Sequence, residues 1–250
     1  MRYVNLIRNI ANWRTYLNLK FGLDTADPMV WTTRTGITVT TPRRMMQTFK
    51  EIFMDECYMA GLGRPVPKDA AVIDIGANVG YFSLFAAHRF DNPRIIAVEP
   101  IPANFALLEK HRDINPSVRL SCLQAAVGSG RGTLTLSFNE ADSFTTSATV
   151  FTEYHPEDTV IEVPCLSIPD LLADYGLLQC DLLKMDCEGA EYDILYTCPR
   201  EVFAHIDQMA LEVHRGPHEG ENIDALDAYL QSLGYETRRK PVGMLWAWQK

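Results

Sequence analysis

The sequence predicts an α/β fold built around a doubly wound, mostly parallel sheet. From residue 71 onward, short apolar runs typical of strands alternate with longer amphipathic runs typical of helices. Such strict alternation favours a parallel sheet with helices on both faces. The length of 250 residues and the hydrophobic content of 47% are ordinary for a single folded domain.

Residues 1–70 are predicted to form an extension that packs on a core of residues 71–250. Within residues 1–21, apolar side chains recur at helical spacing, which predicts an amphipathic helix. Such a helix usually faces a core, although a membrane-surface or dimer-forming helix has the same pattern. The apolar positions are Leu6, Ile10, Trp13 and Leu17.

Two more elements are predicted before the core begins. The segment VWTTRTGITVT predicts a hairpin that turns near Thr35 and Gly36. The segment from Pro42 to Met59 predicts a helix closed by Gly61.

The core elements then follow in order. Strands are predicted at AVIDIG, RIIAVEP, VRLSCLQAAVG, DLLKMD and QMALEVH, and helices at YFSLFAAHRF, PANFALLEKHRD, AEYDILYT and NIDALDAYLQSLG. GTLTLSFN and TVIEVPCLS predict antiparallel strands added to this core, and the polar residues 139–158 between them are numerous enough to form a lid. YETRRK and MLWAW predict a closing antiparallel hairpin.

Charge and cysteine content narrow the function classes. A net charge of −9 provides little neutralisation of phosphates, so no nucleic-acid partner is expected. The six cysteines form no C-x-x-C pair and show no zinc-type spacing with histidine. No signal-peptide core and no apolar run of roughly 18 residues is present, so we expect a cytoplasmic protein without a membrane span.

The first strand-to-helix turn of the core is the predicted ligand site, because open α/β sheets bind ligands at the carboxyl ends of their strands. The turn reads VIDIGANVGYFS, in which Gly76 allows a sharp turn and Gly80 a close approach of the helix. It departs from the G-x-G-x-x-G pattern of dinucleotide sites. Asp74 suits a cationic ligand better than a phosphate.

Glu99 ends the second strand, where a carboxylate can accept hydrogen bonds from both hydroxyls of a ribose. Together with Asp74 it favours S-adenosylmethionine, whose sulfonium and ammonium are cationic, over NAD. An NAD-dependent oxidoreductase or epimerase is the alternative. The predicted cofactor-binding residues are Asp74, Gly76, Ala77, Asn78, Gly80, Tyr81, Glu99, Pro100, Gln124, Ala125, Ala126 and Asp186; residues 124–126 are included by position alone.

The run DLLKMDCEGAEYDIL places several charged groups where a strand becomes a helix. Strand alternation puts Lys184 and Asp186 on one side, with Asp186 at the cofactor's edge. Lys184 is either paired with a nearby acid or a catalytic lysine with a lowered pKa. Glu188 either belongs to the site or caps the next helix, and Glu191 is expected to support the first turn of that helix.

The next strand ends in ALEVH, with Glu212 and His214 on the same side. If this strand adjoins DLLKMD, these side chains converge with Asp186 and Glu188 at one rim. His214 or Asp186 would then take the proton of an acceptor.

The same set could hold Mg²⁺ or Mn²⁺, but acid clusters are common at sites without metal, and we predict none. The predicted catalytic residues are Asp186, His214, Glu212, Glu188 and Lys184. Glu56 and Tyr58 of MDECY either close over the site or end a helix.

The series VIDIGANVG, VEPIPANF, AAVG, DLLKMDCEGAEYDIL and ALEVH, preceded by KEIFMDECY, resembles the FkbM-like family of S-adenosylmethionine-dependent methyltransferases over roughly residues 30–216. The resemblance implies a class I methyltransferase (Rossmann-like) fold with strand order 3-2-1-4-5-7-6 and S-adenosylhomocysteine as a product. It also implies methyl transfer, usually to a hydroxyl of a sugar, natural product or other small metabolite.

Some relatives modify nitrogen in peptides, so an N-methyltransferase acting on a peptide or amide is an alternative. A non-catalytic module that binds an adenosyl ligand would keep the fold without the chemistry. The sequence predicts neither the acceptor nor the oligomeric state.

Overall fold

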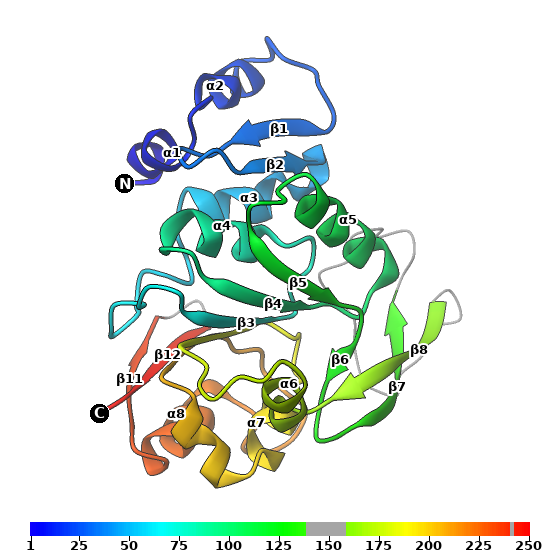
Figure 1. Ribbon diagram of the computed structural model, residues 1–250, viewed down its shortest axis with the longest axis vertical. Helices are drawn as coiled ribbons and strands as arrows, with labels where there is room; N and C mark the ends of the chain where they lie inside the picture. Colours follow the sequence, from blue (N-terminus) through cyan, green and yellow to red (C-terminus); the bar gives the residue numbers. More distant parts are fainter. Residues whose placement is uncertain (139–158, 241–242) are drawn as a thin grey trace.

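The computed structural model describes residues 1–138, 159–240 and 243–250 (Figure 1). Its centre is a seven-stranded sheet in the order β11-β12-β10-β9-β3-β4-β5. The strands are β3 (Ala71–Ile75), β4 (Arg94–Val98), β5 (Arg119–Leu123), β9 (Leu182–Met185), β10 (Gln208–Glu212), β11 (Tyr235–Arg239) and β12 (Met244–Gln249).

The first five core strands in sequence order run parallel, whereas β12 is antiparallel to both β10 and β11. If these seven strands are numbered along the chain, their order is 3-2-1-4-5-7-6. The predicted doubly wound sheet and its closing hairpin are therefore confirmed.

Helices cover both faces of this sheet. One face carries α3 (Met46–Phe53), α4 (Tyr81–Arg89) and α5 (Pro102–Asp113), and the other carries α6 (Ile168–Asp174), α7 (Glu191–Thr197) and α8 (Ile223–Ser232). Successive strand residues point to opposite faces. Accordingly, Leu182 packs in the first apolar core, whereas Leu183 and Met185 pack in the second.

The N-terminal elements lie at one end of the molecule, farthest from α7 and α8 (Figure 1). They are α1 (Arg2–Asn9), α2 (Arg14–Lys20), β1 (Met29–Thr32) and β2 (Thr38–Thr41). The predicted single helix over residues 1–21 is wrong, because Ile10 is extended and forms a bridge with Thr33. The predicted hairpin is confirmed: β1 and β2 pair in antiparallel register.

The helix predicted from Pro42 to Met59 is shorter in the structure. A 3₁₀ turn over Arg43–Met45 leads into α3, which ends at Phe53. Gly61 does not close this helix. Instead it packs on an indole ring, and a Cβ there would lie 2.2 Å from Trp246 Cδ2.

A second sheet stands beside the core and contains β6 (Ala126–Val127), β7 (Gly132–Phe138) and β8 (Thr159–Leu166) in the order β6-β8-β7. β7 and β8 are antiparallel, as predicted, but they form this separate sheet and do not extend the central one. The predicted lid over residues 139–158 lies outside the described residues. In the part of the chain that the structure describes, no helix is long and apolar enough to cross a membrane.

Candidate functional site

A cavity lies at the carboxyl ends of β3, β4 and β9. Its wall includes the β3–α4 turn, the end of β4, residues 125–127, part of β7 and the turn that precedes α7. The predicted cofactor residues that line it are Gly76, Ala77, Asn78, Tyr81, Glu99, Pro100, Ala125, Ala126 and Asp186. The others, Asp74, Gly80 and Gln124, do not line it.

Two glycines shape the turn between β3 and α4. Gly76 has a φ of 67°, and a Cβ there would lie 1.8 Å from the Asp186 carbonyl oxygen. The absence of a side chain thus lets the turn contact the end of β9. Gly80 has a φ of 86°, and its Cβ would lie 2.6 Å from Leu108 Cδ1. Gly80 therefore serves the packing of α4 on α5, and it does not line the cavity.

Glu99 ties the end of β4 to this turn. Its Oε2 accepts a hydrogen bond from the Asn78 N–H (2.8 Å), and its Oε1 accepts one from the Ile101 N–H (3.0 Å). The residue is 4% exposed. Burial raises the pKa of its carboxyl to about 7, against the opposing effect of these donors. A buried, titratable carboxyl thus faces the cavity at the strand tip where it was predicted.

Asp74 does not line the cavity, which corrects the prediction that it meets a cationic ligand there. It is fully buried, and its Oδ1 lies 3.1 Å from Lys184 Nζ, because Asp74 and Lys184 are directly opposed in the β3–β9 register. Ser83 Oγ donates to the other carboxylate oxygen (2.6 Å). An internal ammonium therefore takes the place of the ligand cation that we expected here.

Lys184 belongs to the same buried ion pair. Burial alone would lower the pKa of the ammonium, but the Asp74 and Asp186 carboxylates outweigh it and hold that pKa above its ordinary value. Nζ also donates to the Gly76 carbonyl (2.7 Å). Lys184 is thus a fixed cation in the cavity wall, and the alternative of a catalytic lysine with a lowered pKa is wrong.

Tyr58 enters the site from the segment after α3. Its hydroxyl lies 2.9 Å from Asp186 Oδ2 and 2.9 Å from Glu212 Oε2, and its side chain is buried. Burial, followed by the Asp186 charge, raises the pKa of Glu212. Glu56 was singled out together with Tyr58 from the segment MDECY. It instead accepts hydrogen bonds from Arg8 and Asn9 and lies outside the cavity lining.

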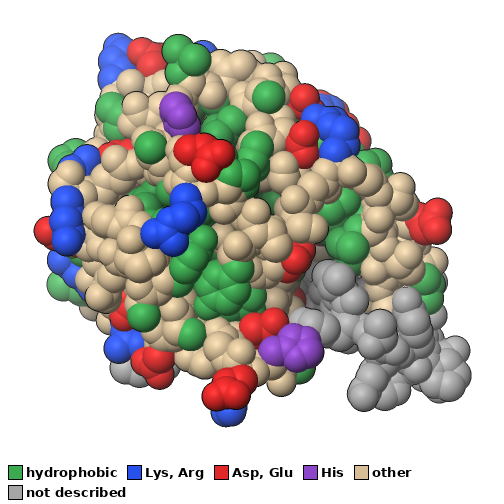
Figure 2. Space-filling model, turned by 90° about the horizontal axis from the view of Figure 1, so that it is seen from below, with side chains coloured by type: hydrophobic (Ala, Val, Ile, Leu, Met, Phe, Trp, Pro, Cys, Tyr) green, Lys and Arg blue, Asp and Glu red, His purple; other side chains and the backbone are tan. Residues whose placement is uncertain are grey.

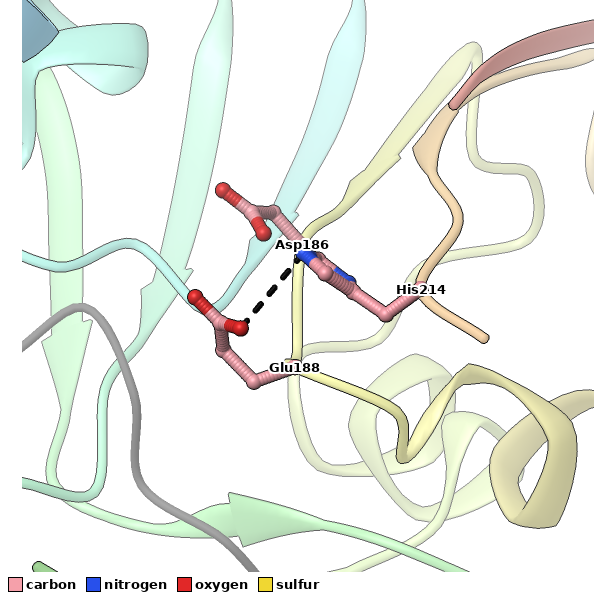
Figure 3. Close-up of side chains that lie close together, drawn as sticks. All are labelled: Asp186, Glu188 and His214. Carbon is pink, nitrogen blue, oxygen red and sulfur yellow. Dashed lines mark ion pairs between the residues drawn. The ribbon is translucent and has the colours of Figure 1, made fainter. Parts of the chain in front are cut away.

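Asp186, Glu188 and His214 converge from the ends of β9 and β10 (Figure 3). One nitrogen or oxygen atom of each side chain lies within 4.8 Å of the corresponding atoms of the other two. They meet because β9 and β10 are adjacent and parallel, so the carboxyl ends of both strands reach the same edge. The predicted convergence of Asp186, Glu188, Glu212 and His214 is therefore present.

His214 is held between two carboxylates. Its Nδ1 lies 3.0 Å from Glu191 Oε1, and its Nε2 lies 3.5 Å from Glu188 Oε2. The hydrogen bond with Glu191 raises the pKa of His214 to about 9, despite burial. At neutral pH the imidazole is therefore charged, so it cannot be the resting base that we considered.

The two glutamates beside His214 have different roles. Glu191 is fully buried, begins α7 and accepts hydrogen bonds from the Cys187 and Gly189 N–H groups, so it supports the helix start as predicted. Glu188 lies before the helix with a φ of 51°, and Ala190 occupies the N-cap. Glu188 is thus part of the cavity lining, and the capping alternative is wrong. Burial raises the pKa of its carboxyl to about 7.

Several lining residues were not singled out from the sequence. They include Thr48 and Ile52 of α3, Phe82 of α4, Leu134 and Leu136 of β7, and Cys187. The alternation in GTLTLSFN does place Leu134 and Leu136 on one strand face, but it does not tell which part of the molecule that face meets.

Comparison with known proteins identifies the family. The family described as "Methyltransferase FkbM domain" matches residues 74–237. The chain is 28% identical over 180 residues to Methyltransferase 1 of Beauveria bassiana (strain ARSEF 2860), covering 66% of this chain and 71% of that protein. It is 26% identical over 198 residues to the 31-O-demethyl-FK506 methyltransferase FkbM of Streptomyces tacrolimicus, covering 66% and 73%.

Among solved structures, the methyltransferase FkbM of Methylobacillus flagellatus KT aligns with a TM-score of 0.49 and 16% identity, over 82% of this chain and 54% of that one. Since the family match spans well over half of the sequence, the chain belongs to the FkbM methyltransferase domain family and is an S-adenosylmethionine-dependent methyltransferase.

Proposed function

We propose that this methyltransferase acts on a hydroxyl oxygen of a sugar, natural product or other small metabolite, with Asp186 as the base. One observation carries the proposal: the Asp186 carboxylate, hydrogen-bonded by Tyr58, lines the same cavity as the buried carboxyl of Glu99. The cavity wall thus contains one carboxyl suited to ribose hydroxyls and another suited to a group that must lose a proton.

The residues present fit S-adenosylmethionine. Glu99 offers carboxylate oxygens for ribose hydroxyls, and Ala125, Ala126 and Ile101 form an apolar wall suited to an adenine. The negative charge that we predicted at Asp74 is supplied at the cavity surface by Asp186 and Glu188. When bound, the cofactor supplies a methyl group on a positively charged sulfur.

In the proposed reaction the Asp186 carboxylate would accept the proton of the acceptor hydroxyl, beside the methyl group that bound S-adenosylmethionine would supply. The protein aligns the reacting groups and keeps water away from them. The Tyr58 hydroxyl holds the Asp186 carboxylate in place. Lys184 and His214 supply fixed positive charge beside Asp186, Glu188 and Glu212.

We propose that the His214 imidazolium, and not a divalent cation, balances the acids at this rim. A histidine that binds a metal must be neutral, so a cation would have to displace the proton that Glu191 stabilises. Methyl transfer that survives dialysis against EDTA supports this assignment. Activity that is lost to EDTA and restored by Mn²⁺ would assign Asp186, Glu188 and His214 to a metal.

The test is transfer of an isotopically labelled methyl group from S-adenosylmethionine to a panel of acceptors. Hydroxylated small molecules form one half of the panel, and short peptides and amides form the other. We expect the label to appear as a methyl ether, identified by mass spectrometry. Label found only on peptide nitrogen would favour the N-methyltransferase alternative. Binding of S-adenosylhomocysteine without transfer to any hydroxylated acceptor of the panel would contradict the proposed acceptor class.

A further inference from the structure

Large apolar side chains are exposed mainly at one end of the molecule. Of the eleven that are exposed in the described residues, seven lie within residues 1–30. Val4 (66% exposed) and Ile7 (44%) are three residues apart on α1, and Phe21 (69%) and Leu23 (77%) follow α2 directly. Scattered apolar residues are normal on a protein surface, but a concentration of this kind marks an interaction site.

The same part of the chain is basic in an otherwise acidic protein. Residues 1–34 contain five Lys or Arg residues and two Asp, a net charge of +3. Because the whole chain carries −9, residues 35–250 carry −12. Arg2 pairs with Asp55 and Arg8 with Glu56. Among the described residues, Arg14, Lys20 and Arg34 form no ion pair with an acid. At the end opposite α1 and α2, acidic and basic side chains are interspersed (Figure 2).

We propose that the surface formed by α1, α2 and residues 21–34, here called the N-terminal face, docks on an anionic lipid membrane. Exposed apolar side chains next to Lys and Arg form the combination that lies in the headgroup region of a bilayer. Anionic lipids attract basic side chains within about 10 Å of the surface at moderate salt. The net charge of −12 on residues 35–250 is repelled by such a surface, which favours an approach through the N-terminal face.

A second copy of this chain fits the N-terminal face less well. In a two-fold dimer the same patch meets itself, so two basic surfaces would be brought together. The apolar contact would then oppose the charge repulsion, whereas on an anionic bilayer both contributions are favourable.

The N-terminal face is fixed to the core. Asn5 Nδ2 donates to the Met54 carbonyl (2.9 Å), and Asn9 Nδ2 donates to the Phe53 carbonyl (2.8 Å), which join α1 to the end of α3. Docking would therefore hold the whole protein in one orientation on the membrane. This inference does not depend on the proposed function.

The experiment is flotation of the full chain with lipid vesicles. Vesicles of phosphatidylcholine alone are compared with vesicles that also contain phosphatidylglycerol. We expect the protein to float with the anionic vesicles only, and to be released when NaCl is raised from about 0.1 to about 1 M, where the Debye length falls to about 3 Å. Equal partition into both vesicle types, or into neither, would overturn the proposal.

Two double variants test the basic and the apolar side chains of the N-terminal face. Arg14→Glu/Lys20→Glu should weaken binding to anionic vesicles by about twentyfold or more, since each basic residue near the surface contributes about fivefold. Phe21→Glu/Leu23→Glu should also weaken it strongly. The matched control is Leu178→Glu, at a side chain 90% exposed on the connection between α6 and β9, which should bind like the wild type. An unchanged thermal unfolding midpoint shows that each variant is folded.

Two results would contradict the assignment. One is Phe21→Glu/Leu23→Glu binding anionic vesicles as tightly as Leu178→Glu. The other is a wild-type dimer, seen by light scattering, that this double variant dissociates while neither form binds vesicles. That second result would assign the N-terminal face to another copy of the chain.

Discussion

The Tyr58 hydroxyl lies 2.9 Å from Asp186 Oδ2, although 128 positions separate the two residues in the chain. The same hydroxyl lies 2.9 Å from Glu212 Oε2. A phenol has one hydrogen to donate, so it cannot satisfy both carboxylates fully at the same time. Burial, followed by the Asp186 charge, raises the pKa of Glu212, and the hydrogen bond from Tyr58 opposes this effect.

Tyr58→Phe removes this hydroxyl and keeps the ring, which packs edge-on against Phe82. We expect methyl transfer to fall about tenfold, with S-adenosylhomocysteine affinity unchanged. The hydroxyl lowers the pKa of Glu212, so its loss raises that pKa and should move the acidic limb of the pH–rate profile to higher pH. Tyr235→Phe, which removes a buried hydroxyl elsewhere, is the control and should leave the profile in place. Wild-type rate and profile in Tyr58→Phe would show that the hydroxyl has no role in the reaction.

Lys184→Met leaves the Asp74 carboxylate buried without its counter-charge. Breaking a buried ion pair in this way costs about 3–5 kcal/mol, which urea denaturation measures as a lower free energy of unfolding. Asp74→Asn/Lys184→Met removes both charges and should recover much of the loss. If the single variant is as stable as the wild type, the two groups do not depend on each other.

The affinity for S-adenosylhomocysteine should increase with pH through the titration of Glu99. The pKa of Glu99 is raised to about 7, and hydroxyl donors of a ligand favour the ionised carboxylate. Below that pH a proton therefore competes with the ligand for the carboxylate. We expect affinity measured by calorimetry to be about tenfold higher at pH 8 than at pH 6. Glu99→Gln should bind more weakly and without this pH dependence. A flat profile in the wild type would show that Glu99 does not contact the ligand in its charged form.

Gly76→Ala should damage both folding and cofactor binding. The new Cβ would meet the Asp186 carbonyl oxygen at 1.8 Å, on backbone with a φ of 67°. We expect a loss of more than about 2 kcal/mol in the free energy of unfolding, together with weaker binding of S-adenosylhomocysteine. Gly130→Ala is the matched control, because nothing lies within 4 Å of a Cβ at that position. Equal behaviour of the two variants would mean that the turn can shift away from β9.

The sequence predicted the central sheet and the converging rim because both follow from local pattern. Alternating strands and helices predict parallel strands, and parallel strands bring their carboxyl ends to one edge. Asp186 and His214 could therefore be placed together from the amino-acid pattern of their two strands. The family resemblance supplied the strand order.

Other features depend on information that a local pattern does not contain. The pairing of Asp74 with Lys184 depends on the register between β3 and β9, 110 residues apart in the chain, and it reversed the expected role of Asp74. The position of Tyr58 depends on an irregular segment in which Glu56 has a φ of 53°. α6 was not predicted, because seven residues show little periodicity, although the capping box of Ser167 and Asp170 was a readable signal.

The most direct test of the proposed mechanism is Asp186→Asn, assayed for labelled methyl transfer and for S-adenosylhomocysteine affinity in parallel. The variant keeps the shape of the side chain and removes its ability to take a proton. We predict that transfer to a hydroxyl acceptor falls by a factor of about 10² or more while affinity changes little. Transfer at the wild-type rate would contradict the assignment of Asp186 as the base.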